Sequence, residues 1–418
     1  MNDEGNSYHA LEKCEGVKVA MCYTFPKICF VFNTLLKNIL LLNMSESSTS
    51  SSTGGRGQSG GPPQIEINDK RSIAEFRGLS FSNFQKSKVK VELLTCLVNN
   101  KIEPACYWVA ELICAGHFLD VWDTIILFCS KYIHLGNPKL PIYIAMRFTN
   151  FKDIMSNGYV GNELSMRNNV KVRQLFSEVI CVLCQSRKKH SLESVKIQKD
   201  DEFDMTHMAS KLKAPSIEYA KDVFRSDDPK ELYISMNEFA YHISAKSKNS
   251  VTACYWLEWI LEFETLCKHN KETCIAETRT FAPVLDKFQK DTIWIIWELI
   301  MQEAKNKSIK KKHPLTEKII NALLELFSIK YTSGVKKKRR FIIYFAINLL
   351  TENVDYNIDI ISNKQHIDAI MQKIGLVYKD VKKNEITLGD DYLFHGLERS
   401  NLDKTIERLD KMNEIFNK

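Results

Sequence analysis

Glycine and proline are scarce in this chain, and their scarcity limits the folds that it can adopt. The 418 residues include 16 glycines and 10 prolines, whereas average usage would give about 29 and about 21. Barrels, sandwiches and glycine-rich phosphate-binding folds need many tight turns, so the composition disfavours them. Hydrophobic residues at 44% and charged residues at 26% are ordinary for a soluble globular protein, which excludes a largely disordered chain or a polytopic membrane protein. We therefore predict an all-α fold.

Apolar residues recur at helical spacing along most of the chain after residue 70, and several of these runs have recognisable ends. The expected helices are 89–100, stopped by Asn99-Asn100; 105–116, closed by Gly116; 118–136, closed by Gly136; 171–190, with cations in its last turn; and 230–243, opened by Asp227-Asp228-Pro229. The apolar run 341–352 is expected at the centre of a C-terminal helical bundle. Three-residue steps in 405–416 predict an amphipathic helix that covers either a groove or a partner.

An internal repeat indicates how the helices are organised. The sequence Ala-Cys-Tyr-Trp-Val at 105–109 recurs as Ala-Cys-Tyr-Trp-Leu at 253–257, offset by 148 residues, and 120–128 has a weaker echo at 291–300. A chance match of five residues is the alternative, but cysteine, tyrosine and tryptophan are all uncommon. The repeat predicts two related helical modules. The predicted divisions are 1–64 as an extension and tail, 65–195 as module 1, 196–330 as module 2 and 331–418 as a C-terminal helical region.

The first 64 residues have a composition of their own. The apolar stretch 17–43 is interrupted by three lysines and a proline, so its longest clean run falls well short of the ~20 residues that span a bilayer. Met44 then opens a run rich in Ser, Gly and Pro that is expected to be a flexible tail. We expect Met44 to be the true start; the alternative is that 17–43 is a membrane anchor.

Two resemblances are carried by particular residues. The segment 107–140 resembles the helical collar that follows the ATPase core in clamp-loader-type AAA+ proteins, through Tyr107-Trp108, Ala115-Gly116 and the turn 135–138. No G-x-x-x-x-G-K-[ST] occurs, and the glycines of 54–61 lack the following Lys and Ser or Thr, so this resemblance implies shared packing and no ATP hydrolysis.

The second resemblance covers most of 70–400. The chain resembles an uncharacterised all-helical protein family of nucleocytoplasmic large DNA viruses, through segments 105–108, 133–140, 202–204, 212–215, 237–242 and 253–256. This resemblance implies an infected-cell or virion setting and supplies no activity.

The sequence contains no recognised catalytic, nucleotide or metal motif, so we expect a non-enzymatic protein without a cofactor. Cys181 and Cys184 form a C-x-x-C pair, but they lie mid-helix, where two buried thiols are favoured over a zinc site completed by Cys267, His269 and Cys274. The acidic run 200–204 near His207 is favoured as helix-start carboxylates over a divalent-ion site. The 12 cysteines lie mostly in apolar runs, which indicates a reducing, intracellular compartment.

Three dense basic clusters suggest an anionic partner. The candidate polyanion-binding residues are Lys336, Lys337, Lys338, Arg339 and Arg340; Lys310, Lys311 and Lys312; and Arg187, Lys188 and Lys189. Five cations at the N-terminus of a helix oppose the helix dipole, so a need for anion binding would explain their place. The alternatives are solvated connecting loops or a nuclear-import-like sequence, and convergence of the three clusters on one face would favour a nucleic acid.

Four tryptophans form the candidate protein-binding stripe. They are Trp256, Trp259, Trp294 and Trp297. Their three-residue spacing predicts an interface between two helices, and partial exposure would make them contacts for a partner.

These observations predict a helical scaffold or assembly protein that binds other proteins and carries a basic face. Protein partners are expected, nucleic acid is a further candidate partner, and no membrane contact is expected unless 17–43 is an anchor. The alternative functions are a replication-associated DNA-binding factor with collar-like packing and an enzyme with an unrecognised site.

Overall fold

Helices are the only extended secondary structure in the part of the chain that the structure describes, which confirms the all-α prediction. The structure is a computed structural model, and it describes residues 65–197, 203, 205–306, 313–387 and 402–416. Within these ranges there is no β-strand, and one isolated bridge joins Leu79 and Gln85. The predicted tail and anchor in residues 1–64 lie outside the described residues.

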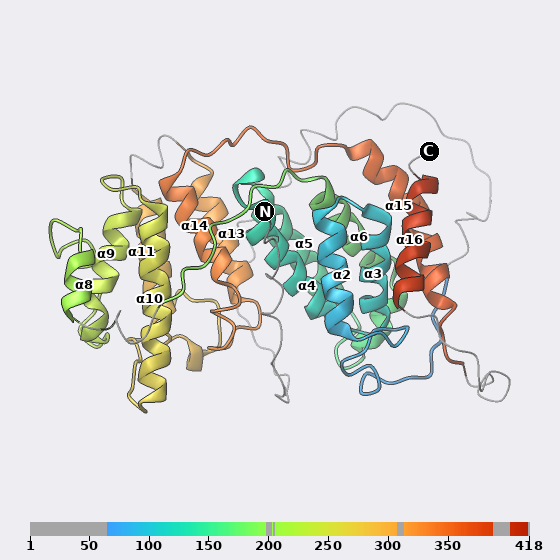
Figure 1. Cartoon of the computed structure of the whole chain (residues 1–418). Helices are drawn as coiled ribbons and strands as arrows, with labels where there is room; N and C mark the ends of the chain where they lie inside the picture. Colours follow the sequence, from blue (N-terminus) through green and yellow to red (C-terminus); the bar gives the residue numbers. More distant parts are fainter. Residues whose placement is uncertain (1–64, 198–202, 204, 307–312, 388–401, 417–418) are drawn as a thin grey trace, which may run out of the picture. The chain divides into compact units, whose positions relative to one another are not determined.

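The α-helices alternate with short 3-10 segments and one π-helical segment. The α-helices are α2 (Lys86–Val98), α3 (Ile102–Cys114), α4 (Phe118–Leu127), α5 (Leu140–Ser156), α6 (Val170–Gln185), α8 (Met205–Lys211), α9 (Tyr233–Ile243), α10 (Ser250–His269), α11 (Ile293–Ala304), α13 (Thr316–Ser328), α14 (Arg340–Thr351), α15 (Lys364–Lys382) and α16 (Leu402–Phe416) (Figure 1). The π-helical segment is Phe128–Ile133, and the 3-10 segments are His134–Gly136, Glu163–Asn168, Lys230–Leu232 and Asp286–Phe288.

The end of α3 follows directly from its sequence. Gly116 adopts a φ of +79°, the left-handed conformation that glycine enters without strain. The N–H of His117 donates to the carbonyl of Leu112 at 2.8 Å, and the N–H of Gly116 donates to that of Ile113 at 2.9 Å. These two bonds form a Schellman motif, so the predicted stop at Gly116 is confirmed.

Gly136 has a different role from the predicted one. The expected helix 118–136 is divided into α4, the π-helical segment and a 3-10 turn. A Cβ atom at Gly136 would lie 2.2 Å from the carbonyl oxygen of Arg187. This distance is far too short for a carbon and an oxygen that are not bonded to each other. Glycine is therefore required here because the chain after α6 passes directly against it, and a left-handed helix end is not involved.

Two further helix ends differ from the prediction. α6 ends at Gln185, so the cations from Arg187 onward lie beyond the helix and outside its last turn. Asp228 does not cap α9, which is preceded by the 3-10 turn and has no side-chain cap. The buried carboxylate of Asp228 instead accepts two hydrogen bonds from Arg279, at 2.7 and 2.6 Å.

The two copies of the repeat occupy matching places in the fold. The first copy lies on α3, the second helix of the hairpin α2–α3, and the second copy lies on α10, the second helix of the hairpin α9–α10. Trp108 and Trp256 are both fully buried. The helices that follow the two hairpins pack differently: α4 packs on α3, whereas α11 packs on α9, α13 and α14. The duplication itself stays a prediction.

The predicted C-terminal region 331–418 does not form a bundle of its own. α14 packs against α10, α11 and α13, and also contacts α4 and the π-helical segment. α15 packs on α3 and α6, and α16 packs on α3 (Figure 1). α5 and α13 join the group of helices around α3 to the group around α14, and the described residues belong to one unit. The predicted boundaries near 195 and 330 stay predictions.

Candidate functional site

The first candidate site, the cation run Lys336–Arg340 before and at the start of α14, is largely ion-paired within the protein. Lys336 is 9% exposed, and its ammonium lies 2.5 Å from Glu264 and 2.7 Å from Asp291. Burial alone would lower the pKa of Lys336, but the two carboxylates outweigh it and raise the pKa. Lys336 therefore neutralises buried carboxylates and is not available to an external anion.

Two neighbouring cations of this run pair with an acidic row on α10. Lys337 lies 2.8 Å from Glu262, and Arg340 lies 2.9 Å from Glu258, one helical turn away. The hydroxyl of Tyr344 also donates to Glu258 at 2.7 Å. Burial raises the pKa of Glu258, and the nearby Arg340 opposes that increase. The acidic row compensates the unfavourable position of the cations at the N-terminus of α14.

Arg339 closes the end of α13. Its guanidinium donates to the carbonyls of Phe327 and Ile329 at 2.8 and 2.6 Å, and pairs with Asp123 of α4 at 2.8 Å. Carbonyls at a helix C-terminus lack intrahelical hydrogen-bond donors, and the guanidinium of Arg339 provides donors for these two. Lys338 is the exposed member of the cluster. Internal carboxylates and carbonyls account for the positions of four of these five cations, so anion binding is not needed to explain them.

The second basic cluster lies apart from the first. Arg187 is exposed, Lys188 donates to the carbonyl of Cys184 at 2.6 Å, and Lys189 lies 3.0 Å from Glu352. Glu352 follows the C-terminal end of α14, whereas the first cluster lies at its N-terminal end. Twelve residues of helix separate them, about 18 Å at the rise of an α-helix. The third cluster, Lys310–Lys312, lies outside the described residues, and the two described clusters do not converge.

The candidate partner-binding tryptophans are core residues. Trp256, Trp259, Trp294 and Trp297 are 0–3% exposed. The rings of Trp256 and Trp259 pack with each other and Trp259 also stacks on Phe263 of α10, whereas Trp294 and Trp297 pack on Phe327 of α13. The predicted single interface between the two pairs is therefore replaced by two packing sites, and neither offers a surface to a partner.

The C-x-x-C pair is buried in α6, as the sequence favoured. Cys181 and Cys184 are 0–1% exposed, and the thiol of Cys181 is hydrogen-bonded with that of Cys106 on α3. Burial raises the pKa of Cys184 well above its usual value, which leaves the thiol protonated and unreactive. No group of three or more His, Cys, Asp or Glu side chains suited to a metal ion occurs among the described residues. Most of the acidic run 200–204 lies outside that part of the chain.

A buried ion pair that the sequence did not suggest joins the start of the described chain to the end of α15. Asp69 and Arg71 form a two-pronged pair, with N–O distances of 2.9 and 2.6 Å. The second oxygen of Asp69 accepts the N–H of Ile386 at 2.9 Å, and Arg71 also donates to the carbonyl of Asn384 at 3.4 Å. We call these four residues the clasp.

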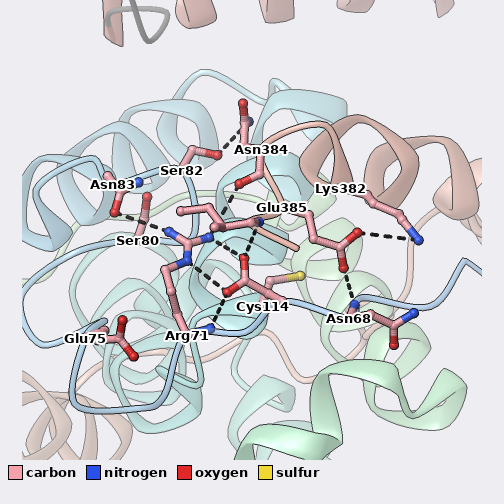
Figure 2. A network of polar contacts seen from close by, with 12 residues as sticks. Asn68, Arg71, Glu75, Ser80, Ser82, Asn83, Cys114, Lys382, Asn384 and Glu385 are labelled. Atoms are coloured by element: carbon pink, nitrogen blue, oxygen red, sulfur yellow. Dashed lines mark hydrogen bonds and ion pairs between the residues drawn. The ribbon is translucent and has the colours of Figure 1, made fainter. Parts of the chain in front are cut away.

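Neighbouring polar groups extend the clasp. Figure 2 shows Asn384 reaching Ser82, at 2.7 Å, and Arg71 reaching Asn83, at 3.2 Å. Lys382 pairs with Glu385, which also accepts the N–H of Asn68. The polar groups of this network form hydrogen bonds or ion pairs with other parts of the chain. The network therefore resembles a structural contact more than a substrate site. Only the long-range fold brings these residues together, so no local sequence signal could have identified them.

The remaining candidate is the surface on which α16 lies. Leu409 and Thr405 of α16 are buried against α3, and Ile406 and Met412 are half-buried. Asp410 lies 2.7 Å from Lys101, just before α3. The predicted amphipathic helix therefore covers a groove of its own chain. The side chain of Ile415 lies outside the described residues.

A cavity of about 90 Å³ opens beside Met412. Its apolar lining includes Cys106, Ile370 and Val377, and charged or polar side chains at its rim include Glu103, His366 and Lys373. Leu376 of α15 lies at the same place and is 51% exposed. We call the surface of α3 and α15 around α16 and this cavity the α16 groove. Apolar floors with polar rims are typical of grooves that bind helices.

No helix among the described residues is both long and apolar enough to cross a bilayer. Comparison of the chain with protein-family models, curated proteins and solved structures finds no match in any of the three. The resemblances to a viral family and to the clamp-loader collar therefore stay predictions.

Proposed function

We propose that this protein is a non-enzymatic helical scaffold that binds another protein through the α16 groove. The observation that carries the proposal is the groove itself, which has an apolar floor, a charged rim and an unfilled cavity beside a half-exposed leucine. The internal pairing of four of the five cations at Lys336–Arg340 favours protein binding over the alternative of nucleic-acid binding. The nine free cysteines of the described residues, eight of them buried, support the proposed intracellular setting.

A site-specific photo-crosslinker tests the proposed surface. The crosslinking amino acid replaces Leu376 in the full chain, produced in the cells that naturally make it. Leu285, which is 58% exposed and belongs to the loop between α10 and α11, serves as the matched control. We expect a discrete crosslinked protein from position 376 and none from position 285.

A second pair of variants tests whether binding depends on the groove. Leu376→Glu, in a chain without the crosslinker, places a charge on the apolar surface. The partner identified by crosslinking should no longer copurify with this variant, whereas it should still copurify with Leu285→Glu. Equal crosslinking from the two positions, or equal recovery with the two glutamate variants, would remove the groove as the partner site.

A further inference from the structure

The attachment of α16 has the composition of a helix–groove complex within one chain. Its groove-facing side chains recur three and four residues apart: Thr405 and Leu409 are buried, and Ile406 and Met412 are half-buried. This is the pattern by which an amphipathic helix places one face in a groove. The neighbouring polar positions are also matched to the groove, since Asp410 pairs with Lys101.

A second ion pair fixes the direction of α16 in the groove. Arg408 lies 3.2 Å from Asp380, near the C-terminal end of α15. Met412, one turn later on α16, lines the cavity together with Ile370, which lies ten residues earlier on α15. α16 therefore runs antiparallel to α15, and the groove presents Asp380 to Arg408 and, two residues further along α16, Lys101 to Asp410.

The contact is incomplete, and its charged parts are open to solvent. Lys101 and Asp410 are 40% and 43% exposed, so water and salt screen their attraction. The cavity beside Met412 leaves room for a larger side chain at that position. α16 therefore occupies the groove but leaves part of its apolar surface without a contact.

We propose that the α16 groove binds an amphipathic helix of a partner protein in competition with α16. The chemistry of that helix follows from α16: apolar residues at i, i+3 and i+6, as in Ile406, Leu409 and Met412, a cation directly before the central apolar residue and an acid directly after it. A residue larger than methionine at the last apolar position would fill the cavity. This inference rests on the proposed function and adds the class of partner and its competition with α16.

The test uses a fluorescent peptide of residues 402–416 and the full-length chain, with binding measured by anisotropy. In the wild-type chain, α16 holds the groove at high effective concentration, so added peptide binds weakly. Leu409→Glu in the chain removes the central apolar contact of its own α16. We expect this variant to bind the peptide at least tenfold more tightly than the wild-type chain does.

A charge exchange identifies the groove as the place of binding. Lys101→Glu, added to the Leu409→Glu chain, should weaken binding of the peptide at least threefold, and Asp410→Lys in the peptide should restore it. Lys338→Glu, an exposed change outside the groove, is the matched control and should have no effect. Met412→Phe in the peptide should tighten binding at least threefold by filling the cavity.

The outcomes separate this inference from the proposed function. Circular dichroism establishes that each variant is folded, and Asp410→Lys in the chain is a milder opening variant for use if Leu409→Glu unfolds. Failure of the peptide to bind a folded opening variant, equal binding to wild-type and opened chains, or failure of the charge exchange would overturn helix competition. The crosslink at Leu376 could still be observed in each of those cases, since it requires a partner but no helix.

Discussion

His134 joins the two groups of helices through a fully buried imidazole. Its Nδ1 lies 3.0 Å from the carbonyl oxygen of Ser130, and its Nε2 lies 2.8 Å from the side-chain nitrogen of Asn348 on α14. A carbonyl can only accept and an amide nitrogen can only donate, so Nδ1 carries the proton and Nε2 is bare. Burial lowers the pKa of His134 from 6.5 to about 4.

This lowered pKa predicts a loss of stability in mild acid. Between pH 6.5 and pH 4 the unfolded chain binds a proton at His134 that the folded chain does not, so the free energy of unfolding falls as pH falls. The full effect for this one residue is about 3 kcal/mol. Urea unfolding of the wild type and of His134→Gln between pH 7 and pH 4 measures it. The variant should show a shallower pH dependence, and parallel curves would contradict the assignment.

Asp228 and Arg279 show what a local reading of the sequence cannot supply. The sequence Asp227-Asp228-Pro229 has the form of a helix start, but the carboxylate of Asp228 serves Arg279, which lies 51 residues further along and is fully buried. Arg279 also reaches Glu298 of α11 at 2.9 Å. A buried charge requires a partner, and no local pattern states which distant residue provides it.

At the scale of elements, the N-terminus of α14 is stabilised by charge pairing that begins outside the helix. Lys336 faces two carboxylates, those of Glu264 and Asp291, which are 9% and 7% exposed. The hydroxyl of Tyr331 also donates to Asp291 at 2.9 Å. Removing the ammonium would therefore leave two buried acids without their cation.

Lys336→Met is expected to lower the free energy of unfolding by about 3–5 kcal/mol, the usual effect of breaking a buried pair. Lys338→Met, two residues away at an exposed position, should change it by less than about 0.5 kcal/mol. Denaturant midpoints of the two variants provide the measurement. Equal midpoints would show that the run acts as a solvated basic patch, as the sequence first suggested.

Helix existence was predictable from the sequence, whereas the roles of charged residues were not. Apolar spacing located α3, α6, α9, α14 and α16, because burial of one face follows the helical period. The stop at Gly116 was also predictable, since it depends on backbone conformation alone. The internal partners of the basic run before α14 were not predictable because they lie on α10 and at Asp291, far away in the sequence.

At the scale of the whole molecule, the C-terminal helices bind back onto the first group of helices. An apolar helix face does not specify which neighbour will cover it. The sequence therefore did not indicate that α14 packs against α10 and α13, or that α15 packs against α3 and α6. The amphipathic pattern of α16 predicted that it covers either a groove or a partner, and only the fold identified the covered surface as that of α3.

The clasp makes the stability of the whole molecule depend on contact between residues more than 300 positions apart. Arg71 holds Asp69, and both contact the segment after α15. The guanidinium also lies over the rings of Phe76 and Phe81, at 4.6 and 4.9 Å from their centroids. Arg71→Met keeps an apolar chain over the rings but leaves the fully buried carboxylate of Asp69 without its cation.

We expect Arg71→Met to lower the free energy of unfolding by about 3–5 kcal/mol, and hydrogen exchange should locate the effect. Amides of 65–85 and 383–387 should exchange faster in the folded variant than in the wild type, because the two segments separate before the rest of the molecule unfolds. Arg77→Met is the matched control, since Arg77 is exposed in the same segment. If the two variants had the same stability and the same exchange pattern, the clasp would be a by-product of packing. A selective change at both segments would instead show that the clasp ties the segment after α15, and with it one wall of the α16 groove, to the start of the described chain.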